Sequence, residues 1–156
     1  MLGRSGVGKS ECALELIHRA HRLVADDVIE LSITKARKLS GRAPDRIRHY
    51  MEIRGLGIFF VPDLFGADSV RDEMEIDLIC RLERWREEVV YERVGLERPT
   101  EELSGVKIPT LTLPARPGGS MATVVEVAAR EHLQRSVGVN AVTRLDQQLR
   151  DEMGRQ

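Results

Sequence analysis

The first ten residues contain the pattern most directly linked to chemistry, a glycine-rich segment that ends in Lys9 and Ser10. This segment satisfies G-x-x-x-x-G-K-[ST], the pattern of a phosphate-binding loop, or P-loop. Glycines let backbone N–H groups turn toward an anion, the lysine reaches the terminal phosphates, and the hydroxyl ligates Mg²⁺. We therefore expect nucleotide phosphates to be bound by Gly3, Arg4, Ser5, Gly6, Val7, Gly8, Lys9 and Ser10.

Carboxylates are the second requirement of phosphoryl transfer, for Mg²⁺ and for the proton of the acceptor group. Asp26 and Asp27 follow a short apolar run about one helix after the loop. A strand end at this point would bring both carboxylates near the terminal phosphate and the metal, and an ordinary acidic turn is the alternative. Glu52 precedes a glycine-containing apolar stretch, where composition alone favours a solvated salt bridge over a metal ligand.

Cations are the third requirement, because charge develops on the transferred group. Arg93 follows the stretch 85–92, and Arg116 lies among two prolines and two glycines. On residue type alone, both arginines are equally well explained as surface or turn residues. The 4 histidines show no metal spacing, and we expect Cys12 and Cys80 to be buried free thiols.

The elements that must position these residues are short and alternate between helix and strand patterns, which indicates an α/β fold. Helices are expected over 10–21, from Ser120 as N-cap, and from near Asn140 with Val142, Leu145 and Leu149 facing inward. We expect a loop with one helical turn over 35–50 and strands over 23–25, 28–33, 53–61 (bent or bulged), 74–82 and 106–113. A P-loop normally follows a buried strand, and only two residues precede Gly3, so we expect that strand to be missing and the N-terminus to be weakly ordered.

Composition limits the classes of function. At 156 residues the chain fits one domain, and 24 basic residues against 25 acidic ones give no field that would attract nucleic acid or an anionic membrane. No apolar run reaches the roughly 20 residues of a membrane span, and no secretory pattern opens the chain. We expect a cytoplasmic protein without nucleic-acid or membrane partners.

Taken together, the motifs resemble the C-terminal catalytic domain of HPr kinase/phosphorylase, a bacterial enzyme that acts on a serine of the sugar-transport phosphocarrier HPr. The resemblance covers nearly the whole chain. Besides the P-loop, it rests on residues 21–27 (HRLVADD), 47–49 (IRH), 52–58 (EIRGLGI), 64–67 (LFGA), 91–96 (YERVGL), 114–118 (PARPG) and 125–129 (VEVAA).

The resemblance implies roles for the candidate residues. Lys9 and the loop would hold ATP, Ser10 and Glu52 would hold Mg²⁺, and the aspartate pair would act as base in the kinase reaction and as acid in its reversal by inorganic phosphate. Asp27 is preferred for proton transfer, and Asp26 would bind the metal or orient its neighbours. Arg93 resembles the active-site arginine of the family, and Arg116 belongs to a loop needed for dephosphorylation.

The resemblance also implies a P-loop kinase fold similar to phosphoenolpyruvate carboxykinase, a mixed β-sheet with flanking helices, HPr as the partner, a homohexamer, and a role in carbon catabolite regulation. We expect a single catalytic domain over 1–156, without the N-terminal regulatory domain of the family. Two other functions stay open from the residues: a P-loop kinase of a small metabolite, and a nucleotide-sensing module with impaired catalysis. ATP and pyrophosphate also stay open as alternative donors.

Overall fold

The computed structural model of the chain describes residues 1–91, 95, 98–116 and 118–153. Within these residues the strands are β1 (Leu2–Gly3), β2 (Glu30–Ile33), β3 (Leu39–Arg42), β4 (Tyr50–Ile53), β5 (Gly57–Phe60), β6 (Glu73–Glu75), β7 (Ile79–Arg84), β8 (Thr100–Leu103) and β9 (Val106–Ala115). The helices are α1 (Lys9–His18), α2 (Val61–Phe65), α3 (Met121–Ser136) and α4 (Ala141–Met153), with 3₁₀ turns at Asp45–Ile47 and Ala67–Ser69.

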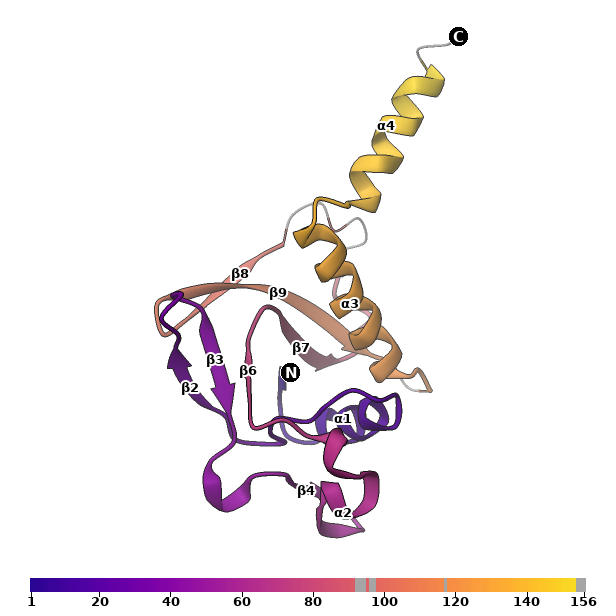
Figure 1. The fold of residues 1–156 in the computed structure, drawn as a ribbon. Coiled ribbons are helices and arrows are strands. Elements are labelled where there is room, and N and C mark those ends of the chain that lie inside the picture. Colours follow the sequence, from indigo (N-terminus) through magenta and orange to yellow (C-terminus); the bar gives the residue numbers. More distant parts are fainter. Residues whose placement is uncertain (92–94, 96–97, 117, 154–156) are drawn as a thin grey trace.

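The strands form a four-stranded sheet, a three-stranded sheet and a hairpin (Figure 1). The four-stranded sheet has the order β1-β7-β9-β8, in which β1, β7 and β9 run parallel and β8 runs antiparallel. The order β2-β3-β6 makes an antiparallel sheet, and β4 pairs with β5. The carboxyl ends of β1, β7 and β9 therefore share one edge, the edge at which open α/β sheets bind ligands. The expected mixed sheet with flanking helices is confirmed.

Helices α1 and α3 cover one face of the four-stranded sheet. Cys80 and Leu82 of β7, two residues apart and thus on the same face, are buried with Cys12 of α1 and Val125 of α3. Helix α3 begins as predicted, because the Ser120 hydroxyl accepts a hydrogen bond from the backbone N–H of Thr123. This packing fixes α1, and with it the point at which the P-loop ends.

The other side of α1 packs on the β4-β5 hairpin and α2. Ile17 of α1 is buried in one cluster with Met51 of β4 and Val61 of α2. A third cluster joins the two sheets and takes one residue each from β3, β7 and β9: Leu39, Ile79 and Ile108. The hairpin that carries Glu52 is therefore held against the same helix that follows the P-loop.

The expectation that the P-loop lacks a preceding strand is wrong. Leu2 and Gly3 form β1, which pairs in parallel with Arg81 and Leu82 of β7. The two backbones approach closely because position 3 is glycine: a Cβ there would lie 2.5 Å from the carbonyl oxygen of Leu82. The loop thus starts from the edge of the sheet, as the mechanism of a P-loop requires.

Predictions for three segments also need correction. The segment 53–61 is part of a hairpin, not one bent strand, because Gly55 and Gly57 adopt φ values of +87° and +99° that turn the chain back. The segment 74–82 splits into β6 and β7, which belong to different sheets. The segment 35–50, expected as a loop, contains β3. Short apolar runs reveal a strand but not where the chain changes direction.

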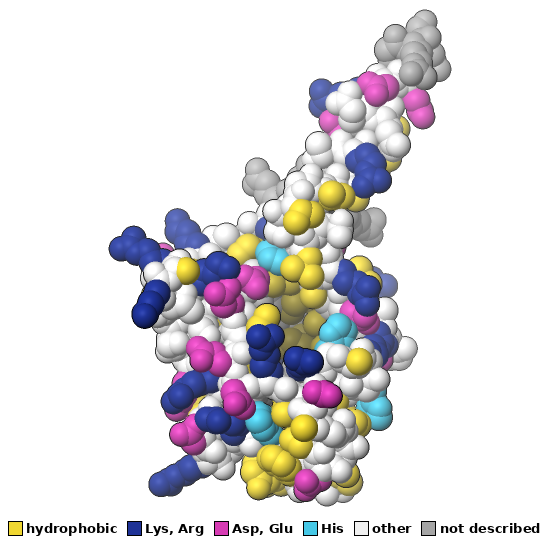
Figure 2. Space-filling model, viewed as in Figure 1, with side chains coloured by type: hydrophobic (Ala, Val, Ile, Leu, Met, Phe, Trp, Pro, Cys, Tyr) yellow, Lys and Arg dark blue, Asp and Glu magenta, His cyan; other side chains and the backbone are white. Residues whose placement is uncertain are grey.

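Helix α4 extends away from the body of the molecule, and none of its residues is buried (Figure 1). The prediction that its apolar residues face inward is wrong, since Leu145 is 56% exposed and Leu149 is 49% exposed. Hydrophobic side chains remain on the surface near the junction of α3 and α4 (Figure 2). Among the described residues, no helix is long and apolar enough to cross a membrane.

Two sets of ionisable groups belong to this framework. Cys12 and Cys80 are buried free thiols, as predicted, and burial raises the pKa of Cys12 to about 11. On α3, hydrogen bonds from Arg130 and from Arg19, which directly follows α1, lower the pKa of Glu126 to about 2. This carboxylate therefore links the two helices that cover the sheet.

Candidate phosphate-binding and acid/base site

The P-loop leads from the end of β1 to the start of α1 and turns through its glycines. Gly6 and Gly8 have φ values of +76° and +97°, in the left-handed region that favours glycine. Gly8 precedes the first turn of α1, and no side chain caps the N–H groups of that turn. These groups and the positive end of the helix dipole are thus available to an anion.

Lys9 points back to the start of the loop, whereas Ser10 points to Asp26. The Lys9 ammonium group donates to the carbonyl oxygens of Gly3, at 2.9 Å, and Arg4, at 3.3 Å. The Ser10 hydroxyl donates to Oδ1 of Asp26 at 2.8 Å. The side chain required for the terminal phosphates is therefore held by the loop, and the one required for a metal is held by a predicted carboxylate.

A cavity of about 440 Å³ opens beside the loop. It unites the predicted phosphate-binding residues with the predicted carboxylates, which come from separate segments of the chain. The lining residues are Gly3, Ser5, Gly6, Gly8, Lys9, Ser10, Glu11, Asp26, Asp27, Glu52 and Arg54. The structure thus brings together most of the site that the sequence predicts.

The two adjacent aspartates have different surroundings. Asp26 is half-buried, and its second oxygen, Oδ2, accepts a hydrogen bond from the backbone N–H of Glu52 at 3.2 Å. Both of its carboxylate oxygens are therefore engaged. The exposed Asp27 carboxylate makes no hydrogen bond or ion pair within the part of the chain that the structure describes. Of the two aspartates, Asp27 is thus the one whose carboxylate no hydrogen bond holds in place, which leaves it available to an incoming proton.

The donor set fits Mg²⁺ bound together with a nucleotide. Ser10, Asp26 and Glu52 supply oxygen atoms to the cavity, and Mg²⁺ prefers oxygen ligands. Because the Ser10 hydroxyl gives its hydrogen to Asp26, its own lone pairs are free for a cation. Among the described residues, no group of three or more His, Cys, Asp or Glu forms a cage for a metal. Water and phosphate oxygens would complete the shell, as is usual for Mg²⁺.

Arg54 is a residue of the cavity to which the sequence argument assigned no role. It lies in the turn after β4, and its Nη2 donates to the hydroxyl of Ser5 at 3.0 Å, so that its guanidinium reaches across to the P-loop. The guanidinium adds a second cation beside Lys9. The feature of the sequence that could have indicated a role for Arg54 is its position two residues after Glu52 and next to Gly55.

Of the two arginines predicted from the sequence, Arg116 is described by the structure, and it does not line this cavity. Arg116 follows β9 directly, and its guanidinium carbon lies 3.8 Å from the centre of the Trp85 ring, where it lines a different cavity. Arg93 lies outside the described residues. The described part of the site therefore takes its positive charge from Lys9 and Arg54.

Comparison with known families gives one match over most of the chain. The sequence model of the "HPr Serine kinase C-terminal domain" matches residues 1–149. The HPr kinase/phosphorylase of Thermoanaerobacter pseudethanolicus is 50% identical over 154 residues, which is 99% of this chain and 50% of that protein. That of Leptospira biflexa is 47% identical over 151 residues, or 96% of this chain and 47% of that protein. The chain thus spans about half the length of these curated relatives.

A solved structure shares the fold. The HPr(Ser) kinase/phosphatase from Coxiella burnetii superposes with a TM-score of 0.80 at 34% sequence identity. The match covers 88% of this chain and 83% of that one. The similarity therefore includes the arrangement of the elements as well as the motifs.

Proposed function

This chain belongs to the family of HPr serine kinase C-terminal domains, and we propose from this that it transfers phosphate between ATP and a serine of the phosphocarrier HPr. In the forward direction it is a protein-serine kinase. In the reverse direction it is a phosphorylase, which removes the phosphate with inorganic phosphate and forms pyrophosphate. A role in carbon catabolite regulation belongs to the same proposal.

The phosphates of ATP would bind to the P-loop. The N–H groups at the start of α1 would face the phosphate oxygens, and the Lys9 ammonium would leave the carbonyl oxygens of Gly3 and Arg4 for the terminal phosphates. Ser10 and Glu52 would hold Mg²⁺, which neutralises charge on the phosphates when bound. Arg54 would keep the loop and the β4-β5 hairpin together through Ser5.

Asp27 would carry the proton in both directions. In the kinase reaction it takes the proton of the serine hydroxyl while the serine oxygen attacks the γ-phosphorus and ADP leaves. In the reverse reaction inorganic phosphate attacks the phosphoserine, and Asp27 returns the proton to the leaving serine oxygen. Asp26 would orient Ser10 and the backbone of Glu52, because both of its oxygens are already engaged there.

The observation that carries this proposal is the cavity whose lining includes Lys9, Ser10, Asp26, Asp27 and Glu52. It combines a phosphate cradle, a metal donor set and a free base within one space, as a phosphoryl-transfer site requires. The likeness to phosphoenolpyruvate carboxykinase, the homohexamer, the role of Arg93 as an active-site arginine and the place of Arg116 in a loop needed for dephosphorylation remain parts of the proposal. Sedimentation analysis of the protein with and without nucleotide would test the assembly.

The direct test is to incubate the protein with HPr, ATP and MgCl₂ and to measure phosphoserine on HPr by mass spectrometry. When the protein is incubated with phosphorylated HPr and inorganic phosphate, it should remove the phosphate group from the HPr serine and release pyrophosphate. The Lys9→Ala variant should lose ATP binding, measured by calorimetry, and both activities, with an unchanged circular dichroism spectrum. Nucleotide binding by the wild-type chain without phosphoserine on HPr would refute the proposal and favour a nucleotide-sensing module.

A further inference from the structure

A second cavity, of about 420 Å³, lies beside a stack of flat side chains. The rings of Trp85 and Tyr91 are stacked with centroids 4.9 Å apart at an angle of 26°, and the Arg116 guanidinium lies over Trp85. Val90, which is 96% exposed, also lines the cavity, and Trp85 and Tyr91 are themselves half-buried. Flat aromatic and guanidinium surfaces of this kind are the usual platforms for nucleobases.

Core packing does not account for this stack. Neither Trp85 nor Tyr91 belongs to the three buried clusters that hold the described elements together. Within the described residues, Arg116 forms no ion pair with a carboxylate, and its contact is with the Trp85 ring. Trp85, the 1 tryptophan of the sequence, is thus placed beside an open cavity with an unpaired cation above it.

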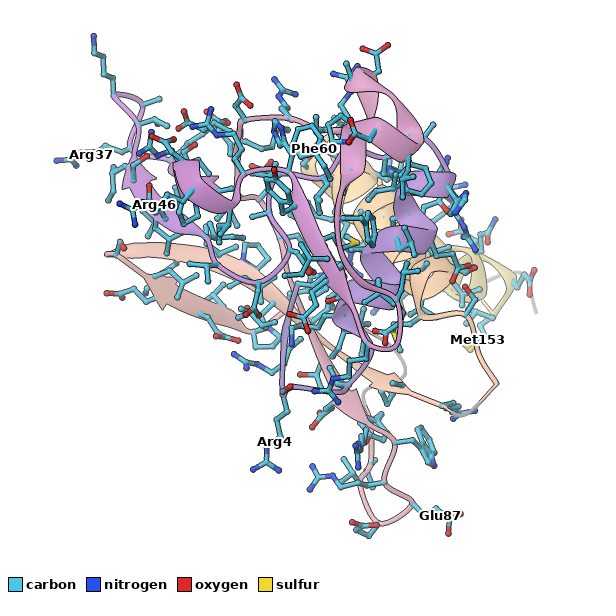
Figure 3. All side chains as sticks on the ribbon, turned by 90° about the horizontal axis from the view of Figure 1, so that it is seen from below. Arg4, Arg37, Arg46, Phe60, Glu87 and Met153 are labelled. Atoms are coloured by element: carbon cyan, nitrogen blue, oxygen red, sulfur yellow. The ribbon has the colours of Figure 1, made fainter. Side chains whose placement is uncertain are left out.

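The position of the stack relates it to the P-loop. Gly3, Trp85 and Arg116 stand at the carboxyl ends of the three parallel strands β1, β7 and β9. Gly3 pairs with Leu82, and Trp85 lies three residues further, about 10 Å along the strand at its usual rise. Arg4 of the P-loop and Glu87, just beyond Trp85, extend from the same side of the molecule (Figure 3). A nucleoside triphosphate spans a distance of this order between its base and its terminal phosphate.

From this placement we propose that the cavity beside Trp85, Tyr91 and Arg116 binds the purine base of the nucleotide whose phosphates occupy the P-loop. The inference rests on the proposed function, because it takes the P-loop to hold a nucleotide. The apolar lining, from Pro114, Met121 and Val124, suits the edge of a flat heterocycle, and the Ser120 hydroxyl is the polar neighbour. Arg116 then acts on the base instead of on the transferred phosphate.

Calorimetry with two ligands, ATP and inorganic tripolyphosphate, tests this proposal, because the two share the phosphates and differ in the base. The wild-type chain should bind ATP more tightly than tripolyphosphate. Trp85→Ala should weaken ATP binding by about tenfold or more, the usual effect of removing one aromatic side chain on which a base stacks. The same variant should leave the affinity for tripolyphosphate unchanged. Trp85→Phe, which keeps a stacking face, should bind ATP nearly as well as the wild type.

Several results would overturn the proposal: equal wild-type affinity for the two ligands, unchanged ATP affinity in Trp85→Ala, or an equal loss for both ligands in that variant. The Lys9→Ala variant separates this inference from the proposed function. It should weaken ATP and tripolyphosphate together, since both use the P-loop. If Lys9→Ala leaves tripolyphosphate affinity unchanged, the P-loop assignment fails, whatever the Trp85 variants do.

Discussion

Exchanging each of the two adjacent aspartates for asparagine should give opposite results, because only one of them is tied into the structure. Asp26→Asn changes a carboxylate that accepts from the Ser10 hydroxyl at 2.8 Å and from the Glu52 backbone at 3.2 Å. Asparagine can still accept from the Glu52 N–H through its oxygen, but its N–H₂ group can only donate to Ser10, so the Ser10 hydrogen bond must reverse and both contacts lose the carboxylate charge. Asp27→Asn removes charge from a group without such contacts among the described residues.

The expected magnitudes follow from these contacts. A hydrogen bond to a charged group contributes about 1.5–3 kcal/mol, and partial exposure of Asp26 reduces this, so we expect Asp26→Asn to cost about 1–2 kcal/mol in the free energy of unfolding. For a domain of this size, that cost lowers Tm by about 2–8 °C. Asp27→Asn should change the free energy of unfolding by less than about 0.5 kcal/mol. Loss of a general base should instead lower its kcat by about 10²- to 10⁴-fold.

Three measurements on each variant check this prediction: thermal unfolding, phosphorylation of HPr, and phosphorolysis of phosphorylated HPr. Asp27→Asn should slow both reactions by a similar factor, because one group carries the proton in both directions. Its ATP affinity should stay at the wild-type value. Full activity of Asp27→Asn, loss of only one direction, or an unchanged Tm in Asp26→Asn would refute the division of roles drawn from the hydrogen bonds.

Three further predictions concern the framework of the site. Gly3→Ala should lower Tm more than Gly8→Ala: both positions have positive φ, but only at Gly3 would a Cβ clash with the backbone of β7, so β1 must shift. Below pH 4.5 the wild type should lose stability as pH falls toward 2. Hydrogen bonds from two arginines lower the pKa of Glu126 to about 2 in the folded protein. The Glu126 carboxylate therefore stabilises the fold at pH values above its pKa in the unfolded chain, and this stabilisation is lost as the group protonates. In acid titrations followed by circular dichroism, Glu126→Gln should show a shallower loss, and an unchanged slope would contradict the role of this group. Cys12, with a pKa of about 11, should not react with a thiol reagent at pH 8 until denaturant unfolds the chain, and rapid reaction in the native state would contradict its burial.

The chemistry of phosphate binding could be predicted from the sequence because it is local. Gly3 to Ser10 are contiguous, and the conformations of Gly6 and Gly8 and the start of α1 depend mainly on neighbouring residues. The helices with regular apolar spacing, α1 and α3, were predictable for the same reason. The carboxylate candidates also followed from residue type and from their places beside apolar runs.

Contacts between distant residues decided the rest. The partners of Asp26 are 16 and 26 residues away, so no local pattern distinguishes it from Asp27. The same applies to Arg54, which meets Ser5 across 49 residues of chain. Such pairings depend on which strands lie side by side, and a strand pattern does not specify its neighbour.

The strand ahead of the P-loop and the helix at the end of the described chain both show that a local pattern does not specify which segments pack together. A two-residue segment gives no periodic signal, yet Leu2 and Gly3 form β1 because β7 presents a free edge to them. Helix α4 has the apolar spacing of a buried helix, yet no described element covers it. The sequence by itself determined the phosphate-binding chemistry and the amphipathic faces, because both arise from residues close together in the chain. Only the tertiary structure decided which edges pair, which faces are covered and which carboxylate stays free, because those outcomes depend on packing between distant segments.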